Sequence, residues 1–175
     1  MLTVVDIETT GLQPREDHIV EVGLVRMDEA GLIRGSWSTL VRATRYDQHG
    51  FPVDPLTFIH GIPASELVKA PRWAHIAHRI AHALDGATII GHNARKFDVP
   101  FLKRACARAG YHFTPGAIID TLERDRIVRH TTGRRTLTAA CAAYGIATPN
   151  AHRALNDCLA TAELATRQAA LIGWA

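Results

Sequence analysis

The sequence predicts an α/β protein in which helices flank a mixed five-stranded sheet. Three apolar segments follow one another near the N-terminus with short polar gaps, which is typical of antiparallel strands. Two further short apolar segments alternate with helical patterns, which indicates strands that run parallel and are joined by helices. With 175 residues, the chain is long enough to form this sheet as one domain, residues 1–175.

The elements can be assigned in order along the chain. The first three strands are expected at Leu2–Ile7, Ile19–Met27 and Ile33–Val41, with Gly, Pro, Asp and Glu in the gaps. An irregular segment, Ala43–Pro63, precedes a helix that begins near Pro71. The later strands are expected at Ala87–Gly91 and Ala117–Ile119, and the later helices at about Phe97–Ala109, Leu122–Val128, Leu137–Tyr144 and Arg153–Ile172.

The helix that begins near Pro71 is amphipathic. Its apolar face is formed by Trp73, Ile76, Ala77, Ile80, Ala81 and Leu84. Its opposite face carries His75, His78, Arg79 and His82. Histidines at this spacing could bind a metal adventitiously, but a polar stripe opposite an apolar face is typical of a solvent-facing surface.

The composition is that of an ordinary globular protein, with 47% hydrophobic and 21% charged residues. No apolar run approaches the roughly 20 residues that span a bilayer, and no basic segment precedes an apolar stretch at the N-terminus. We therefore expect a cytoplasmic protein that does not interact with membranes. Cys106, Cys141 and Cys158 are odd in number and lack zinc-ligand spacing, so we expect reduced core residues.

The basic residues are mostly arginine, although the net charge is only +3. Arginine favours bidentate contacts with phosphate, so a polyanionic substrate is compatible with this composition. The densest basic segment contains Arg124, Arg126, Arg129, Arg134 and Arg135. This segment either follows a phosphate backbone or forms a solvated surface.

Two carboxylates close the first strand. Asp6 and Glu8 are two residues apart, so their side chains lie on the same face, next to the turn that follows. Neighbouring negative charges repel each other unless a cation lies between them, and Mg²⁺ and Mn²⁺ prefer oxygen ligands. The same short pattern also occurs as simple acids at a strand end, so it needs support from elsewhere.

That support comes from two further acidic motifs. They are GHNARKFD at residues 91–98 and AHRALND at residues 151–157. Together with the acids of the first strand, these segments resemble the three ordered motifs of the DnaQ-like (DEDDh) 3′-to-5′ exonucleases, a family that includes polymerase proofreading subunits and RNase T-type enzymes. The resemblance extends from Leu2 to about Leu171, including accessory stretches at residues 59–62 and 137–146. It implies a ribonuclease-H-like fold.

Four carboxylates can neutralise two divalent cations, Mg²⁺ or Mn²⁺. Two metals about 3.5–4 Å apart can activate a water molecule and stabilise the leaving 3′-oxygen of a phosphodiester. Asp6, on the central strand, is expected to bridge both metals. Glu8 and Asp157 would complete the first metal environment, and Asp98 would help to hold the second. Asp98 also suits the first turn of a helix for electrostatic reasons, but the preceding Phe97 and the rest of its motif favour the metal role.

His152 precedes Asp157 by five residues, just before the last expected helix. A histidine titrates near neutral pH, at about 6.5 when unperturbed, and can therefore act as a general base. The sister (DEDDy) group has a tyrosine in this role, and the Ala154-Leu155 pair here matches the histidine type. A loop histidine is otherwise usually solvated, so its proximity to Asp157 carries the assignment.

The substrate-binding residues are expected around these acids. The turn after the first strand would hold the terminal nucleotide, since glycine permits close backbone approach, and Leu12 would press on the terminal base. Phe97 would add a stacking surface or belong to the core. His60 would contact substrate or only orient its own loop. The expected set is Thr9, Thr10, Gly11, Leu12, His60, Asn93 and Phe97.

These features favour a metal-dependent 3′-to-5′ exonuclease that acts on single-stranded DNA and releases nucleoside 5′-monophosphates. The alternatives are an exoribonuclease of the same superfamily, because a site that grips the backbone can accept either sugar, and a binding module that has lost catalysis. The presence of all four carboxylates opposes the last. The expected partners are DNA or RNA 3′ ends and a separate polymerase or other nucleic-acid-processing protein. The pattern indicates no oligomeric state.

Overall fold

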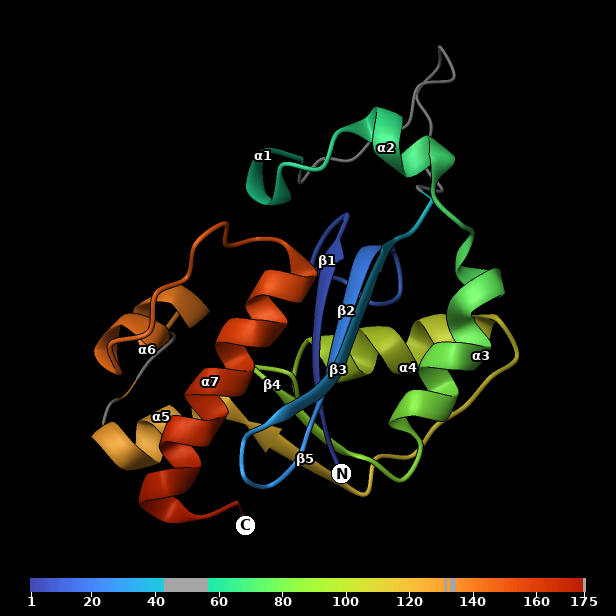
Figure 1. Ribbon diagram of the computed structural model, residues 1–175. Coiled ribbons are helices and arrows are strands. Elements are labelled where there is room, and N and C mark those ends of the chain that lie inside the picture. Colours follow the sequence, from blue (N-terminus) through green and yellow to red (C-terminus); the bar gives the residue numbers. More distant parts are fainter. Residues whose placement is uncertain (43–56, 131, 133–134, 175) are drawn as a thin grey trace.

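A mixed sheet lies at the centre of the molecule (Figure 1). The computed structural model describes residues 1–42, 57–130, 132 and 135–174. In these residues the sheet has five strands in the order β3-β2-β1-β4-β5. They are β1 (Leu2–Thr9), β2 (Ile19–Met27), β3 (Ile33–Leu40), β4 (Thr88–Gly91) and β5 (Ala117–Asp120). The first three strands are antiparallel and β4 and β5 run parallel to β1, which confirms the predicted sheet.

Helices flank both faces of this sheet. Those of the described residues are α1 (Thr57–His60), α2 (Ala64–Lys69), α3 (Trp73–Leu84), α4 (Asp98–Arg108), α5 (Thr121–Arg129), α6 (Leu137–Ala143) and α7 (Ala154–Ile172). One face packs against α3 and α4, and the other packs against α7, beside which α5 and α6 lie (Figure 1). The exposed polar face predicted for α3 is confirmed, because its three histidines and Arg79 are all exposed.

The predicted elements agree with the structure to within about two residues, and β2 has the predicted bounds. The irregular segment Ala43–Pro63 is partly wrong, because α1 forms in its last part; residues 43–56 lie outside the described residues. Helix α2 was not predicted. Both helices are too short to show an amphipathic period. Tertiary packing helps to hold this region, where Ile62 and Leu67 are buried against Val20 of β2.

The alternation of side chains along β1 determines where its acids emerge. Val5 and Ile7 point into the core beneath α3 and α4, whereas Leu2 and Val4 contact the core beneath α7. Asp6 and Glu8 have the parity of Leu2 and Val4, so they lie on the α7 side of the sheet. The central strand therefore presents its carboxylates toward the amino end of α7.

The predicted environment of the cysteines is confirmed. Cys106, Cys141 and Cys158 are free and buried, each in one of the apolar clusters. Among the described residues, no helix has the combination of length and apolar character needed to cross a membrane.

The amino end of α7 lies directly against β2 at Gly23. A Cβ atom at this position would lie 2.5 Å from the carbonyl oxygen of Ala154, at the start of α7. Backbone atoms in a packed helix cannot move aside easily, so only glycine allows this approach. The missing side chain therefore determines how closely α7 and its acids approach the sheet.

We expect Gly23→Ala to lower the free energy of unfolding by about 1–3 kcal/mol, the usual cost of overpacking a core. Urea denaturation measures this change. Gly35→Ala is the matched control, because a Cβ atom at Gly35 on β3 has no neighbour within 4 Å. Equal unfolding free energies for the two variants would show that the contact between Gly23 and α7 does not constrain the packing.

Candidate active site

A cleft of about 630 Å³ opens where the carboxyl ends of β1 and β4 meet the amino ends of α4 and α7. This end of the molecule lies at the top of β1 in Figure 1. The cleft is lined by all four acids that the sequence singled out: Asp6, Glu8, Asp98 and Asp157. Carboxylates separated by up to about 150 residues along the chain therefore converge at one place.

Different elements present these acids. Asp6 and Glu8 extend from β1, Asp98 is the first residue of α4, and Asp157 lies in the first turn of α7. The partial positive charge at a helix amino end favours a carboxylate there. Asp98 and Asp157 are buried, with 3% and 8% of their surfaces exposed. Their burial shows that these acids form the inner wall of the cleft and not a solvated rim.

Burial raises the pKa of every one of these carboxyls, and repulsion by the other cleft acids adds to it for Asp6 and Glu8. The pKa of Asp6 rises well above its usual value because of burial first, and then because of the charges of Asp98 and Asp157. The same two causes raise the pKa of Glu8 to about 8, and burial is the main cause that raises the pKa of Asp98 to about 7. Burial also raises the pKa of Asp157. The described residues thus hold these carboxyls in surroundings that disfavour their ionised form.

His152 lies beside two of the acids. It occupies the loop before α7, is exposed, and has a left-handed backbone with φ of 67°. Its backbone N–H donates a 3.0 Å hydrogen bond to Oδ2 of Asp157. Possible ligand atoms of Glu8, His152 and Asp157 all lie within 4.8 Å of one another. The imidazole is therefore within reach of a cation or water molecule held by these acids.

A fifth carboxylate, missed in the sequence, holds this loop. Glu21 on β2 is paired with Glu8 in the strand register and is buried. Its Oε2 accepts hydrogen bonds from Arg153 Nε (3.2 Å) and from the N–H of Ala154 (3.1 Å), while its Oε1 accepts from Arg153 Nη2 (3.1 Å). This fork connects the residue after His152 to the sheet. A glutamate inside an otherwise apolar strand was the available signal.

Three of the expected substrate-binding residues line the cleft: Leu12, Asn93 and Phe97. Leu12 is 67% exposed, whereas Phe97 is half-buried and packs on Phe101 with ring centroids 4.9 Å apart. Asn93 has a left-handed backbone with φ of 64°, and its N–H donates to Oδ1 of Asp120 at 2.9 Å. Asp120 was missed in the sequence, although it shapes the loop that leads to α4.

The threonines of the turn after β1 shape the turn and do not line the cleft. Thr9 Oγ1 donates to the carbonyl of Gly11 at 2.6 Å, and Thr10 Oγ1 accepts from the N–H of His18 at 3.0 Å. A Cβ atom on Gly11 would lie 2.3 Å from the carboxylate of Asp17, so a side chain there would displace this carboxylate from its hydrogen bond with the N–H of Gln13. The group that approaches Gly11 closely is thus the side chain of Asp17, where a nucleotide was expected. Leu12 is the residue of this turn that lines the cleft.

His60 does not line the cleft. Its side chain is buried, and its Nδ1 accepts a 3.1 Å hydrogen bond from the N–H of Ile62. The preceding Ile59 contributes to the cleft wall instead. Of the two roles considered for His60, the structure favours the orientation of its own loop.

The arginine-rich segment does not form a continuous basic track. Arg124 is buried and donates to backbone carbonyls near the C-terminus, so for this residue both interpretations, a phosphate contact and a solvated surface, are wrong. Arg129 and Arg135 both pair with the buried carboxylate of Asp125, at 3.9 and 3.4 Å. Arg135 alone among the described members of the segment lines the cleft; Arg134 lies outside the described residues.

His92 is a further cleft residue that the sequence analysis did not single out. Its Nε2 lies 2.9 Å from the carbonyl oxygen of Arg135, and its Nδ1 lies 2.9 Å from Thr121 Oγ1. Burial lowers the pKa of His92, which favours the neutral ring. Because a carbonyl can only accept, Nε2–H donates to Arg135, and Nδ1 faces the hydroxyl of Thr121, which also lies 3.3 Å from the carbonyl oxygen of Gly91. His92 thereby connects β4 to the loop on the far wall of the cleft.

Comparison with known proteins identifies the family to which the chain is similar. A family model described as Exonuclease (RNase_T) matches residues 3–165. The chain is 31% identical over 164 residues to the 3′-5′ exonuclease DinG of Staphylococcus saprophyticus, covering 92% of this chain and 17% of that protein. It is also 31% identical to the DNA polymerase III subunit epsilon of Treponema pallidum, covering 94% of this chain and 74% of that protein.

Solved structures share the fold. The structure of E. coli exonuclease I in complex with a dT13 oligonucleotide matches with a TM-score of 0.79 and 22% identity, over 99% of this chain and 42% of that chain. A zinc-bound complex of the same enzyme with single-stranded DNA matches with a TM-score of 0.81 over 97% of this chain and 40% of that chain. The ribonuclease-H-like fold that the sequence indicated is thus confirmed.

The raised pKa of Glu8 predicts a pH-dependent stability in chelator. Between its ordinary value of 4.5 and about 8, the folded state keeps the Glu8 proton that the unfolded state has lost. The stability of the metal-free protein therefore falls as pH rises through this window. Glu8→Gln lacks this contribution, so we expect its Tm to exceed that of the wild type by about 2–4 °C at pH 8 and to converge with it near pH 4.5.

Thermal unfolding in EDTA, followed by circular dichroism across this pH range, measures the difference. Glu163→Gln on the exposed surface of α7 is the control and should follow the wild-type curve, apart from the small loss of its ion pair with Arg167. Parallel curves for Glu8→Gln and the wild type would contradict the claim that Glu8 is held protonated by its neighbours.

Proposed function

Since the chain belongs to the DnaQ-like exonuclease family, we propose that it is a metal-dependent 3′-to-5′ exonuclease acting on single-stranded DNA. The observation that carries the proposal is the convergence of four carboxylates and a histidine on one open cleft. The match to the E. coli enzyme in complex with oligonucleotides supports single-stranded DNA as the substrate class. The chain spans 17% of the length of the DinG relatives, so the proposed activity is that of this domain.

The donor set of the cleft fits divalent cations. Four carboxylates with raised pKa values offer hard oxygen ligands whose charges repel one another until they are neutralised. Two Mg²⁺ or Mn²⁺ ions, when bound, would supply charge neutralisation for the scissile phosphate and lower the cost of forming the nucleophile and the leaving group. Asp6 is the residue we assign to both ions, with Glu8 and Asp157 completing one environment and Asp98 the other.

His152 is the proposed general base. Its side chain would accept a proton from the attacking water as the new bond between oxygen and phosphorus forms and the bond to the 3′-oxygen breaks. The hydrogen bond from its backbone to Asp157 and the fork between Arg153 and Glu21 hold its loop at the cleft. These contacts reduce the positional freedom of the base, which is what proton transfer requires.

Leu12, Asn93 and Phe97 are the proposed contacts of the terminal nucleotide. Leu12 is the exposed apolar residue of the turn, and Phe97 offers a partly exposed ring in the same cleft. An apolar contact and a stacking surface accept any base, because neither reads hydrogen-bonding groups. We therefore assign terminal recognition without sequence preference to these residues.

The proposed function predicts that purified protein with Mg²⁺ or Mn²⁺ shortens a 5′-labelled single strand progressively from its 3′ end. Excess EDTA should abolish the activity, and Asp6→Ala should reduce it by at least about 100-fold, because this residue serves both ions. Denaturing gels of a DNA oligonucleotide and of the matched RNA measure the products and distinguish the two sugars. Full hydrolysis in excess chelator, or equal cutting of a circular single strand, would refute the proposal.

We expect His152→Ala to reduce the single-turnover rate by about 100-fold or more while oligonucleotide binding stays near that of the wild type, since a base and not a ligand is lost. Rapid-quench kinetics and fluorescence anisotropy measure the two quantities. His112→Ala, another exposed histidine outside the cleft, is the control. Near-normal single-turnover rates in His152→Ala would show that the residue has only a structural role.

A further inference from the structure

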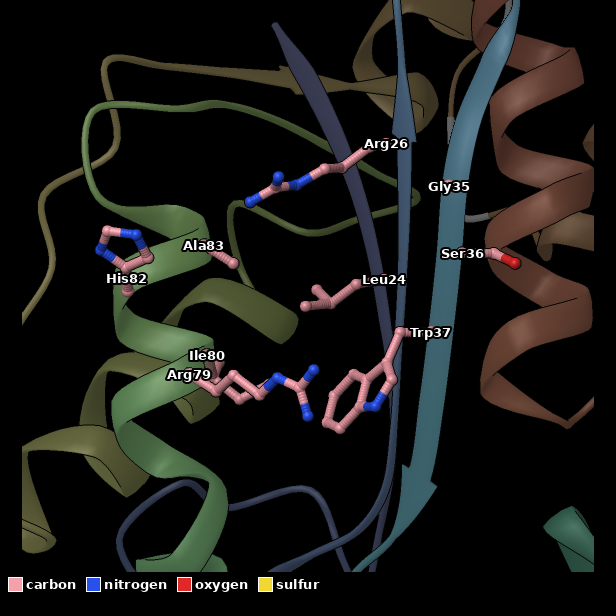
Figure 2. A pocket seen from close by; sticks show the side chains of 9 residues that line it. All are labelled: Leu24, Arg26, Gly35, Ser36, Trp37, Arg79, Ile80, His82 and Ala83. Atoms are coloured by element: carbon pink, nitrogen blue, oxygen red, sulfur yellow. The ribbon is translucent and has the colours of Figure 1, made fainter.

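A second groove lies on the face of the sheet that points away from the four carboxylates. It has a volume of about 510 Å³ and runs between α3 and the strands β2 and β3 (Figure 2). Leu24 and Trp37, which are paired in the register of β2 and β3, line it on the side of the core shared with α3 and α4. The groove shares no lining residue with the catalytic cleft.

Two guanidinium groups reach into this groove from opposite walls. Arg26 extends from β2 and Arg79 extends from α3, and Figure 2 shows both side chains entering the space between these elements. Arg79 lies over the indole ring of Trp37, 5.4 Å from its centroid. His82 lies at the rim and is exposed. No carboxylate is among the described residues that line the groove, and neither arginine forms an ion pair within that part of the chain.

A neighbouring hollow extends the groove past Arg26 and His82. Asp85 also lines this hollow, and its carboxylate accepts a 2.9 Å hydrogen bond from the N–H of Thr114. Around Trp37, by contrast, the described lining residues include two arginines and no acid. An anionic ligand is favoured there, because neither guanidinium group has a carboxylate partner among the described residues.

We propose that this groove binds single-stranded nucleic acid, through phosphates at Arg26 and Arg79 and through a base on the Trp37–Arg79 stack. Guanidinium groups bind phosphate in a bidentate manner and also stack on rings, and an indole is a sequence-tolerant platform for bases. The inference rests on the proposed function, since the bound segment is the part of the substrate strand 5′ to the nucleotide in the cleft.

The topology allows one strand to reach both places. β3 ends the sheet on this side, so nothing in the described sheet separates its two faces beyond that edge. Leu24 on β2 is paired with Trp37 on β3 and with Val5 on β1. Trp37 and Val5 are therefore two strand spacings apart, or about 10 Å across the sheet. Because the cleft opens on the opposite face, where α7 packs on β2 and β3, the path around the edge is longer than this spacing. A long strand can follow that path, whereas a trinucleotide held in the cleft is too short to engage both sites.

Two neighbouring residues of β3 allow a clean test. Gly35 lines the groove, and a Cβ atom there has no neighbour within 4 Å, so Gly35→Glu adds negative charge to the groove without a steric clash. Ser36 also borders the groove, but its side chain points to the opposite side of the strand, as Figure 2 shows. Ser36→Glu therefore introduces the same charge on the same strand with a side chain directed away from the groove.

Fluorescence anisotropy of a fluorescein-labelled strand of about 30 nucleotides, in EDTA, measures binding to the protein. Hydrolysis of that strand and of a trinucleotide, in Mg²⁺, measures the effect of this binding on activity. We expect Gly35→Glu to weaken binding of the long strand about tenfold and to raise its KM accordingly, with the trinucleotide unaffected and Ser36→Glu near wild type. Arg26→Ala with Arg79→Ala should reduce the slope of log K against log salt by about 1.4, which corresponds to two lost phosphate contacts.

Equal affinity of Gly35→Glu and Ser36→Glu for the long strand would overturn the proposal and leave the groove to a different class of partner. An unchanged salt slope in the double arginine variant would also overturn it. The wild-type protein could also bind the long strand, with binding weakened by Gly35→Glu and by the double arginine substitution, and yet hydrolyse neither substrate. That result would refute the proposed function while supporting the groove, so the two failures are distinguishable.

Discussion

The rest of the structure depends on the electrostatic repulsion among carboxylates gathered at one end of the sheet. Asp6, Glu8, Asp98 and Asp157 lie in one cleft where burial, together with the charges of neighbouring carboxylates, raises their pKa values. Such an arrangement destabilises the folded state near neutral pH unless cations bind. A scaffold that keeps the acids in place despite their repulsion is the main requirement, and the packing around α7 provides it.

Two contacts with β2 hold α7 against the acids. The absence of a side chain at Gly23 lets the first turn of α7 approach the strand, and Glu21 binds Arg153 and the N–H of Ala154 at that point. Both residues belong to the strand next to β1, so the same sheet register positions Glu8, Asp157 and the loop of His152. An ion pair between a buried carboxylate and an exposed arginine contributes little stability by itself, but it specifies geometry, which is the use we infer for Glu21.

The sequence was sufficient to predict the strands and the four acids, because period-two alternation and ordered motifs are local signals. It could not reveal Glu21, His92 or Asp120, whose roles come from contacts with residues distant in the chain. It also misjudged Arg124, since a charged residue in a basic segment gives no local sign that it will be buried against the C-terminus. The groove at Trp37 is visible only once α3 is packed beside β3.

Isothermal titration of the metal-free protein with Mn²⁺ at pH 7 in buffers of different ionisation enthalpy tests the central claim most directly. If repulsion among the carboxylates is relieved by cations, two Mn²⁺ ions should bind per chain, and protons should be released because the raised pKa values leave Glu8 and Asp98 partly protonated. Asp6→Ala should weaken binding at both sites. Absence of Mn²⁺ binding, or binding without proton release, would contradict the account.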